Sequence, residues 1–311
     1  PVNRRQRQMC IRDRSKKNSK KKFSVVSNPE FLREGEAIRD FVYPDRVVIG
    51  TNDKKAGRIL KNLYSPLISK GASYLQTSRR AAELIKYASN AFLATKITFI
   101  NEIANLCEKT NINVEDISIG MGLDKRIGSR FLRAGPAYGG SCFPKDTKAI
   151  ITTADKFKTN LSVDKSVIKS NENRSKILLD RIYSILNKKI KNKKITFLGV
   201  TFKANTDDMR DSSSLKMIPW LSKKGAIVRY FDPTGYKSEF SKLRNVTNKT
   251  SIKDAVQGSD LVILHTEWND FKSINFKTLV KGKKFIIFDM RNLYSSTKIN
   301  NQGFTYFSVG K

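Results

Sequence analysis

The chain has 311 residues, of which 39% are hydrophobic, 28% charged and 10% aromatic. This balance is typical of a folded globular protein and excludes a wholly disordered chain. At roughly 150 residues per domain, the length predicts about two domains, each with its own core. The abnormal figure is the formal net charge of +32, from 60 Lys and Arg against 28 Asp and Glu.

Part of this charge lies at the amino terminus. Residues 1–22 hold ten Lys or Arg and one Asp, so they contribute +9 and the rest of the chain +23. The first 22 residues have few apolar side chains, and we expect a disordered, extraneous tail. The remaining charge is spread as single lysines, which favours general lysine richness over a nucleic-acid groove. A basic nucleic-acid-binding protein is the alternative from another class, although no RRM, KH or zinc-finger signature supports specific nucleic-acid binding.

Membrane and metal partners find no support in the sequence. No apolar run approaches the roughly 18 residues of a membrane span, so we expect a soluble, cytoplasmic protein. The three cysteines, Cys10, Cys107 and Cys142, are distant in sequence and form no CxxC pair. This pattern predicts reduced thiols and no metal site. A single histidine, His265, excludes a His-rich metal centre.

The region after the tail has the pattern of an α/β domain. Residues 23–27 (FSVVS) predict a short strand, 28–41 a loop entering a helix, 45–50 (DRVVIG) a second strand, and 54–61 an amphipathic helix. Only about two strand–helix units occur before the pattern changes, fewer than a parallel sheet normally needs.

A long helix is predicted next. Residues 79–109 contain neither Gly nor Pro, and apolar residues occupy more than one helical stripe. A helix of this kind must bury several faces, so we expect it to connect domains and to form a subunit interface. Shorter helical sequence follows at 114–122, and then a glycine-rich stretch from Gly135 to Cys142.

Alternating strands and helices return after Lys193. Strands are predicted at 193–202, 226–232, 260–266, 283–289 and 304–309, and helices at 212–225 and 251–258. This spacing predicts a doubly wound parallel sheet, in which ligands lie beyond the carboxyl ends of the strands. That edge would carry the segment TFK ending at Lys203, Asp232, and Asp289 with Arg291.

The best candidate for chemistry is GGSCFPKDT, residues 139–147. Two glycines allow close approach of a ligand, and Pro144 predicts a helix that begins just beyond Cys142. The helix terminus and Lys145 both favour a thiolate, so we expect a nucleophilic cysteine. Cys107, within the apolar helix, is expected to pack in the core.

Two further pairs have helical spacing. Glu30 and Glu34 lie four residues apart in PEFLREGEA and could act as base or water-positioning groups if Glu34 opens a helix. A solvated surface is the ordinary alternative. Lys86 and Asn90 lie four apart on the long helix and could hold a developing oxyanion, although the lysine could also snorkel to solvent.

Other polar positions give weaker signals. Residues 202–214 follow a strand and precede a helix, where a phosphate site is expected, but they lack the glycines of GxGxxG. Asp232 could mimic a ribose-binding acid, a weak reading without that glycine motif. His265 lacks an obvious Ser or Asp partner and is expected to be structural.

Five motifs in order, spanning about residues 24–308, carry a resemblance to a known family. They are NPEFLREGEA, AAELIKYASNAFLATKITFINEIANLCE, DKRIGSRFLRAGPAYGGSCFPKDT, LGVTFKANTDDMRDSSS and HTEWNDF. Together they closely resemble the UDP-glucose 6-dehydrogenase branch of the UDP-glucose/GDP-mannose dehydrogenase family. The resemblance implies NAD-dependent, four-electron oxidation of UDP-glucose to UDP-glucuronate through a cysteine-bound thiohemiacetal and thioester. GDP-mannose or a UDP-N-acetylhexosamine is the alternative substrate, and HTEWNDF favours UDP-glucose.

The resemblance also implies roles for individual residues. The catalytic set is Cys142 as nucleophile, Lys86 and Asn90 as oxyanion stabilisers, and Asp146 and Glu30 for protons and water. Glu34, Lys145 and Arg210 resemble contacts to NAD. The substrate-binding set comprises Glu30, Phe31, Leu32, Arg33, Lys86, Asn90, Arg126, Arg133, Tyr138, Gly139, Phe202, Lys203 and Arg291. Arg126 resembles an arginine that reaches into a partner subunit's site, in keeping with a homodimer through the helix at 79–109.

The family comparison divides the chain into four segments. Residues 1–22 are the basic tail, 23–78 a remnant of the NAD-binding Rossmann-like domain, 79–175 a central helical dimerisation domain, and 176–311 the UDP-sugar-binding domain. One departure stands out, because no GxGxxG loop occurs in the 311 residues. We therefore expect a chain truncated at its amino terminus that keeps the thiol and the UDP-sugar pocket but binds NAD poorly.

Overall fold

The computed structural model describes residues 23–280 and 284–311, and the predicted basic tail lies outside this range. Its contacts divide the chain between Ser89 and Asn90 into two units. The division falls within the long helix α5 (Arg79–Thr110), whose predicted extent is confirmed. The two units are described separately below.

The first unit is built around two parallel strands, β1 (Arg46–Gly50) and β2 (Ser73–Thr77), with Val48 opposite Leu75. Helix α3 (Lys54–Leu63) connects the strands, together with the short α4 (Ser65–Ile68), and α2 (Ala37–Val42) precedes them. Helix α3 begins where predicted because the Asp53 carboxylate accepts hydrogen bonds from the Lys55 and Ala56 N–H groups.

The predicted strand at 23–27 is wrong. Ser27 alone forms an isolated antiparallel bridge to Gly50, while Phe23 and Ser24 are exposed. The adjacent apolar residues Val25 and Val26 favour a strand, but both lie outside any strand in the structure. The strand β2 was not predicted, because SYLQT has only one strongly apolar residue and is mostly exposed.

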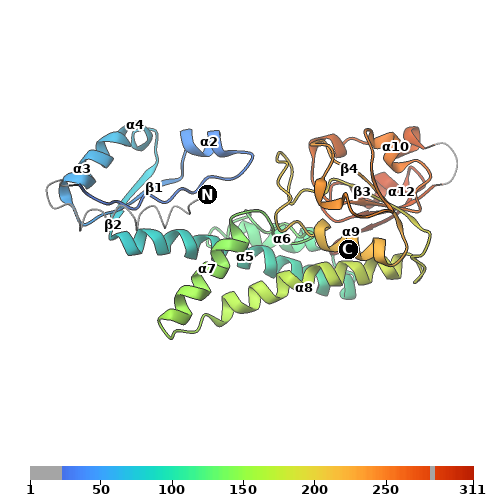
Figure 1. The fold of residues 1–311 in the computed structure, drawn as a ribbon, viewed down its shortest axis with the longest axis horizontal. Coiled ribbons are helices and arrows are strands. Elements are labelled where there is room, and N and C mark those ends of the chain that lie inside the picture. The colour runs from blue at the N-terminus through green and yellow to red at the C-terminus, as the bar shows by residue number, and fades with distance from the viewer. Residues whose placement is uncertain (1–22, 281–283) are drawn as a thin grey trace. The chain divides into compact units, whose positions relative to one another are not determined.

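The second unit begins with helices. After α5, the chain forms α6 (Val114–Leu123), α7 (Phe143–Lys156) and α8 (Ser162–Ile185). Helices α7 and α8 form a helical hairpin (Figure 1). Helices α6 and α7 confirm the predictions, whereas the 24-residue α8 was not predicted.

The rest of the unit is a six-stranded sheet with strand order β5-β4-β3-β6-β7-β8, parallel throughout. The strands are β3 (Lys194–Leu198), β4 (Ile227–Phe231), β5 (Val246–Asn248), β6 (Leu261–Leu264), β7 (Ile286–Asp289) and β8 (Thr305–Ser308). The helices between them are α9 (Ser214–Lys223), α10 (Ile252–Val256), α11 (Phe276–Leu279) and α12 (Ser296–Asn300), with 3-10 turns at Ser238–Phe240 and Asn269–Phe271.

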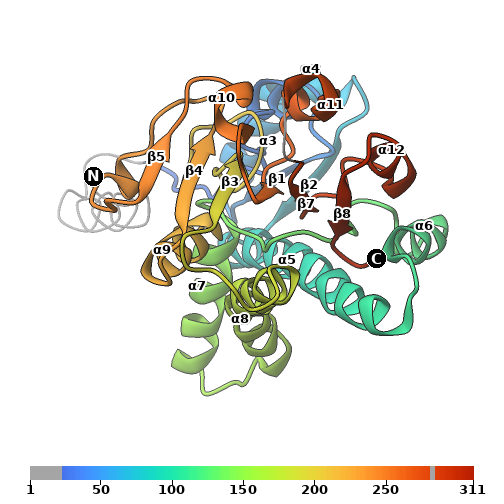
Figure 2. The same ribbon diagram turned by 90° about the vertical axis from the view of Figure 1, so that its right-hand side faces the viewer.

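Two hydrophobic clusters cover the two faces of this sheet. Phe197 and Ile263 pack in a core shared with α5, α8 and α9, whereas Val262 and Ile287 pack with α10, α11 and α12. Figure 2 shows α8 and α9 on one side of the strands and α10 and α11 on the other. The predicted doubly wound parallel sheet is therefore confirmed.

The order reverses between β3 and β6, since β4 and β5 lie to one side and β7 and β8 to the other. The carboxyl ends of parallel strands at such a point form the usual ligand-binding edge of this architecture. No helix in the described part of the chain is long and apolar enough to cross a membrane.

Candidate active site around Cys142

Cys142 lies at the N-cap of α7, as the sequence predicted. The helix begins there because Pro144, in the first turn, needs no hydrogen-bond partner and has a helical φ. The thiol is free and partly exposed, and its Sγ lies 3.6 Å from Ser141 Oγ. The first turn of a helix offers N–H groups and a positive dipole end, the setting in which a thiolate is stabilised. Cys107 is buried in the core, as expected.

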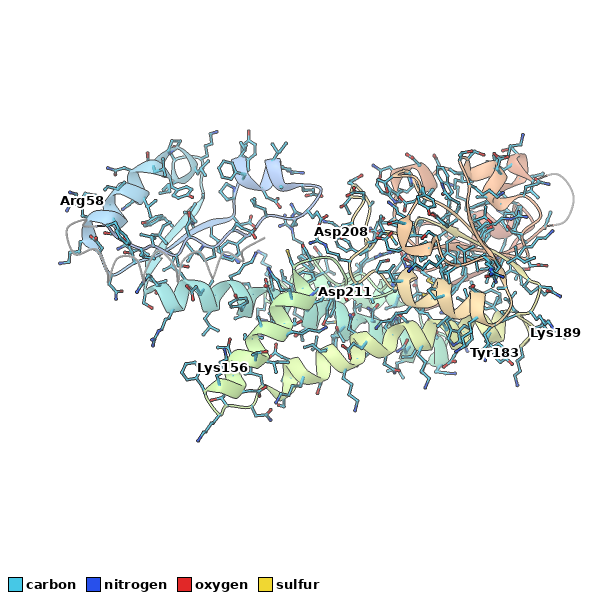
Figure 3. All side chains as sticks on the ribbon, viewed as in Figure 1. Arg58, Lys156, Tyr183, Lys189, Asp208 and Asp211 are labelled. Atoms are coloured by element: carbon cyan, nitrogen blue, oxygen red, sulfur yellow. The ribbon has the colours of Figure 1, made fainter. Side chains whose placement is uncertain are left out.

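Two glycines let the loop before Cys142 contact another loop closely. A Cβ on Gly139 would lie 2.5 Å from the Asp211 carbonyl oxygen, and one on Gly140 would lie 2.6 Å from the Phe202 ring. Gly140 also has φ +79°, which favours glycine, and its N–H donates to the Arg210 carbonyl at 2.8 Å. The glycines thus bring the cysteine loop against residues 202–211, the loop that carries Asp208 and Asp211 in Figure 3.

Asp146 lies one turn after Cys142 and is buried. Its carboxylate accepts a hydrogen bond of 2.6 Å from the Asn90 amide, and Lys145 Nζ lies 3.7 Å away. The backbone N–H of Asp146 donates to the Cys142 carbonyl at 2.9 Å. The second unit therefore brings together Cys142, Asp146, Asn90 and Lys145, a thiol beside a carboxylate, an amide and a cation.

At the carboxyl edge of the sheet, Arg291 ties together loops from different strands. Its guanidinium donates to the carbonyl oxygens of Phe202 and His265, each at 2.8 Å, and forms an ion pair with Glu267 at 2.9 Å. Lys203 follows Phe202 in the sequence, and its Nζ lies 5.6 Å from the Phe202 ring centroid. The predicted rim residues Phe202, Lys203 and Arg291 thus lie together.

The two carboxylates at the same edge of the sheet, Asp232 and Asp289, already accept hydrogen bonds from other parts of the chain. Asp232 is buried and accepts hydrogen bonds from the backbone of Val200 and Thr201. Asp289 accepts from backbone N–H groups and from the Tyr306 hydroxyl, and burial raises the pKa of its carboxyl. These contacts explain why both strands end in Asp, and they use the atoms that a ribose contact by Asp232 would need.

His265 is fully buried, and its Nε2 lies 2.7 Å from Ser213 Oγ at the N-terminus of α9. Burial, assisted by the nearby Arg291, lowers the pKa of His265 to about 3, so the ring is neutral at physiological pH. The expected structural role agrees with this geometry. Sequence reasoning missed the partner Ser213, which lies 52 residues away.

Several predicted binding residues are surface arginines. Arg210 makes a bidentate contact to Asp208, and Arg126 makes one to Asp124 while 88% of its side chain stays exposed. Arg133 is exposed on the stretch that leads to the cysteine loop. Tyr138 differs from expectation in its environment, because its ring is buried against Phe143, Ala94 and Val167, and burial raises its pKa to about 12.

The first unit gathers the other predicted residues. Lys86 Nζ donates to the Glu30 carbonyl oxygen at 2.5 Å and lies 3.4 Å from the Glu30 carboxylate. The Phe31 ring lies 5.6 Å from Lys86 Nζ and 4.1 Å from the Arg46 guanidinium. Lysine, carboxylate and aromatic ring therefore form one cluster in this unit.

The rest of NPEFLREGEA is arranged around this cluster. The Leu32 N–H donates to the Glu30 carboxylate at 2.9 Å, while Arg33 pairs with Asp40 and Glu36, each at 2.7 Å. Helix α2 begins at Ala37, so Glu34 lies in the loop before the helix and does not open it.

Comparison with family models covers most of the chain. Residues 2–68 match the NAD binding domain of the UDP-glucose/GDP-mannose dehydrogenase family, residues 80–173 its central domain, and residues 196–296 its UDP binding domain. The central-domain match contains Asn90, Cys142 and Asp146, and the UDP-binding match contains Phe202 and Arg291.

Curated relatives and solved structures agree with these matches. A UDP-glucose 6-dehydrogenase from Rickettsia felis is 45% identical over 93% of this chain and 65% of its own length. One from Rhizobium meliloti is 44% identical over 93% of this chain and 67% of its own length. A UDP-glucose dehydrogenase structure from Pyrobaculum islandicum superposes with a TM-score of 0.83 at 34% identity, over 93% of this chain and 65% of that one.

The chain thus spans about two thirds of the length of the curated relatives it matches. Over that span the relatives, the three domain matches and the doubly wound sheet agree on one assignment. The chain belongs to the UDP-glucose/GDP-mannose dehydrogenase family.

Proposed function

We propose that this sequence encodes a UDP-glucose 6-dehydrogenase, which oxidises the C6 alcohol of UDP-glucose to a carboxylate with NAD. The observation that carries the proposal is the free thiol of Cys142 at the start of α7, one turn from the Asn90–Asp146 pair. The names of the relatives at 44–45% identity support the substrate.

The proposed reaction consists of two successive oxidations at C6 of the sugar. NAD, when bound, supplies the hydride acceptor for each of them. After the alcohol has become an aldehyde, the Cys142 thiolate adds to the carbonyl carbon and forms a thiohemiacetal. The second oxidation gives a thioester, and water cleaves it to the carboxylate and the free thiol.

Four other residues assist at stated atoms. The Lys86 ammonium and the Asn90 amide donate hydrogen bonds to oxygen atoms on which negative charge develops. The Asp146 carboxylate, held by Asn90, moves the proton of attacking water, and Glu30 positions water. In the first unit, Glu30 already lies within 3.4 Å of Lys86.

The proposed substrate contacts follow the family motifs. The sugar and the nucleotide are held by Phe31, Leu32, Arg33, Arg126, Arg133, Tyr138, Gly139, Phe202, Lys203 and Arg291. Gly139 has no side chain and would contact the substrate through its backbone. Tyr138, whose ring is buried and whose backbone N–H and carbonyl are bound to Asn171, would act by holding this loop in place. Arg291 orders the carbonyls of the sheet edge, which gives a nucleotide a rigid surface to bind.

The residues present fit the phosphates of the cofactor. The Lys145 side chain is 73% exposed and that of Arg210 is 65% exposed, so both can place positive charge beside a pyrophosphate. Glu34 completes the proposed NAD contacts. We further expect the 311-residue chain alone to bind NAD weakly, because its sequence contains no GxGxxG motif.

Thermal shift assays test substrate and cofactor separately. We expect UDP-glucose to raise the melting temperature more than GDP-mannose or UDP-N-acetylglucosamine does, while NAD alone shifts it little. A larger shift with GDP-mannose or with UDP-N-acetylglucosamine would replace the proposed substrate. A clear NAD shift with ordinary NADH formation would refute weak cofactor binding.

We also propose a homodimer that uses α5. Phe92, Phe99 and Leu106 lie seven residues apart on this helix and are 65%, 45% and 58% exposed. On α6, Ile119 and Leu123 add exposed apolar area. Large apolar side chains repeated on one helical stripe favour burial against a second copy.

A further inference from the structure

The loop that carries Cys142 is held from behind by polar side chains of α5 and α8 that the proposed chemistry does not use. At the start of the loop, the Gly135 N–H donates to Asn101 Oδ1 at 2.8 Å. Arg174 Nε donates to the Gly135 carbonyl at 3.1 Å, and its Nη1 donates to the Asn101 carbonyl at 3.3 Å and to the Asn105 side chain. Both backbone polar groups of Gly135 are therefore bound.

A second anchor lies four residues before the cysteine. The Tyr138 N–H donates to Asn171 Oδ1 at 2.9 Å, and Asn171 Nδ2 donates to the Tyr138 carbonyl at 3.1 Å. Because the side-chain amide uses its donor and its acceptor on one residue, it fixes the two peptide units on either side of the Tyr138 Cα. The Tyr138 ring packs edge-on to Phe143 with centroids 6.0 Å apart, on the far side of Cys142.

The residues between the two anchors and the helix give the loop little rigidity of their own. Gly139 and Gly140 carry no side chains, and glycine has the widest choice of backbone conformations. Besides the contacts of these glycines with residues 202–211, Tyr138 on one side and the start of α7 on the other fix where the Cys142 thiol points. The anchors on α8 thus control a property that the loop sequence alone leaves free.

Burial of the Arg174 guanidinium in this anchor costs free energy. Arg174 is 2% exposed, and in the described part of the chain no carboxylate forms an ion pair with it. Burial lowers the pKa of its guanidinium to about 10. The hydrogen bonds that this desolvated cation donates to backbone and amide oxygens offset part of the cost of its burial and fix the positions of those oxygens.

A small cavity completes this anchor. Among the described residues, Arg174 Nη2 and Thr98 Oγ1 are buried without a hydrogen-bond partner. Both residues line a cavity of about 10 Å³ between α5 and α8. That volume is about the space that one buried water needs, and water bound there would satisfy both atoms.

We propose that Asn171 and Arg174 are positioning residues for Cys142. They hold the backbone of residues 135–138 so that the thiol stays at the N-terminus of α7, beside the Asn90–Asp146 pair. The inference rests on the proposed function, because it takes Cys142 as the nucleophile. Nucleophile position matters, since a displacement of about 1 Å can cost a factor of about a hundred in rate.

The test compares two identical substitutions on one helix. Asn171→Asp keeps the acceptor for Tyr138 but removes the donor and sets a carboxylate against the Tyr138 carbonyl. Asn173→Asp makes the same change of charge at an exposed site two residues away and serves as the control. The readout is the rate of Cys142 alkylation by iodoacetamide, resolved by peptide mass spectrometry, with the buried Cys107 reporting on the integrity of the fold.

We expect Asn171→Asp to slow Cys142 alkylation at neutral pH by about tenfold, because the thiolate is no longer held at the helix terminus. In the full-length enzyme, kcat should fall similarly while KM for UDP-glucose stays within about twofold. Asn173→Asp should leave both within about twofold of the parent. An alkylation rate in Asn171→Asp equal to or above that of Asn173→Asp overturns the proposal.

A second variant keeps the test decisive if Asn171→Asp does not fold. Arg174→Lys retains the charge but loses the forked donor geometry, so Cys142 alkylation should slow by at least about threefold. An unchanged rate in this variant, with Cys107 still protected, contradicts the proposal. Alkylation needs neither substrate nor cofactor, so this outcome is distinct from failure of the proposed enzyme activity.

Discussion

At the scale of single residues, the surroundings of Cys142 combine a carboxylate, an amide and a cation. The Asp146 carboxylate is buried, yet it accepts a hydrogen bond from Asn90 and lies 3.7 Å from Lys145. A buried carboxylate with two such partners keeps a fixed direction. Cys142, at the start of α7, therefore has a carboxylate of fixed direction within one helical turn.

The thiol gives the most direct prediction at this scale. Cys142→Ser should reduce UDP-glucuronate formation by the full-length enzyme by at least about a thousandfold, because a hydroxyl is a far weaker nucleophile than a thiol. Product formation is measured by chromatography. As a control, Cys107→Ala removes a buried thiol from the core and should lower stability without removing the chemistry. Substantial acid formation by Cys142→Ser would contradict the proposed function.

His265 predicts a pH dependence of stability. The folded state lowers its pKa from 6.5 to about 3, so the unfolded chain binds a proton between these values and the folded chain does not. The contribution of His265 to the free energy of unfolding is fully present above pH 6.5. It falls by up to about 1.4 kcal/mol per pH unit as pH drops from 6.5 toward 3.

Urea unfolding at pH 7 and pH 5.5 measures this effect. His265→Asn should be less stable than the parent at pH 7 because the Ser213 contact changes, but it should lose less stability between the two pH values. Equal losses in the parent and the variant would show that His265 does not titrate on unfolding.

At the scale of elements, local sequence predicted much of the fold. Helix α5 was predicted because 79–109 lacks Gly and Pro, and α7 because Pro144 follows the cysteine. The five longer parallel strands were predicted from continuous apolar runs. Short helices such as α4, α11 and α12 were missed. Among the other missed elements, β2, β5 and α8 have many polar or exposed residues, and their structure depends on partners distant in sequence.

The site was predictable to a similar extent. Cys142 and Asp146 stand out because Gly, Cys, Pro and Asp are concentrated within one short motif. The motif could not reveal Asn171 or Arg174, which hold the same loop from 33 and 39 residues away. Polar residues on a helix normally face solvent, so only tertiary structure distinguishes those two from the exposed Asn173.

Two glycines of the second unit predict changes of opposite sign in the free energy of unfolding. Gly140→Ala should lower the free energy of unfolding by about 1–3 kcal/mol, since φ is +79° and the new Cβ would lie 2.6 Å from the Phe202 ring. Gly120→Ala, in α6 with open space around the Cβ, should raise it by about 0.5–1 kcal/mol. Urea unfolding measures both, and a neutral or stabilising Gly140→Ala would show that the loop is not constrained as described.

At the scale of the whole molecule, one stripe of exposed apolar side chains runs along the part of α5 that belongs to the second unit. The buried face of this helix, with Ile100 and Ala104, packs against α8 and the sheet, while Phe92, Phe99 and Leu106 remain exposed. Seven-residue spacing keeps these three side chains on one stripe, because two helical turns take about seven residues. A chain of net charge +32 repels its copies at long range, so association requires such a short-range apolar contact.

The stripe predicts the effect of one charge on assembly. Phe99→Glu should weaken dimerisation at least about tenfold, or about 1.4 kcal/mol, because the carboxylate would be buried without a partner. Phe157→Glu is the matched control, since Phe157 is 74% exposed at the end of α7 and lies off the stripe. Light scattering across a dilution series should show the Phe99 variant dissociating at concentrations where the parent and the Phe157 variant remain dimers. If Phe99→Glu assembles like Phe157→Glu, the contact between copies lies elsewhere, and the exposed stripe needs a different occupant.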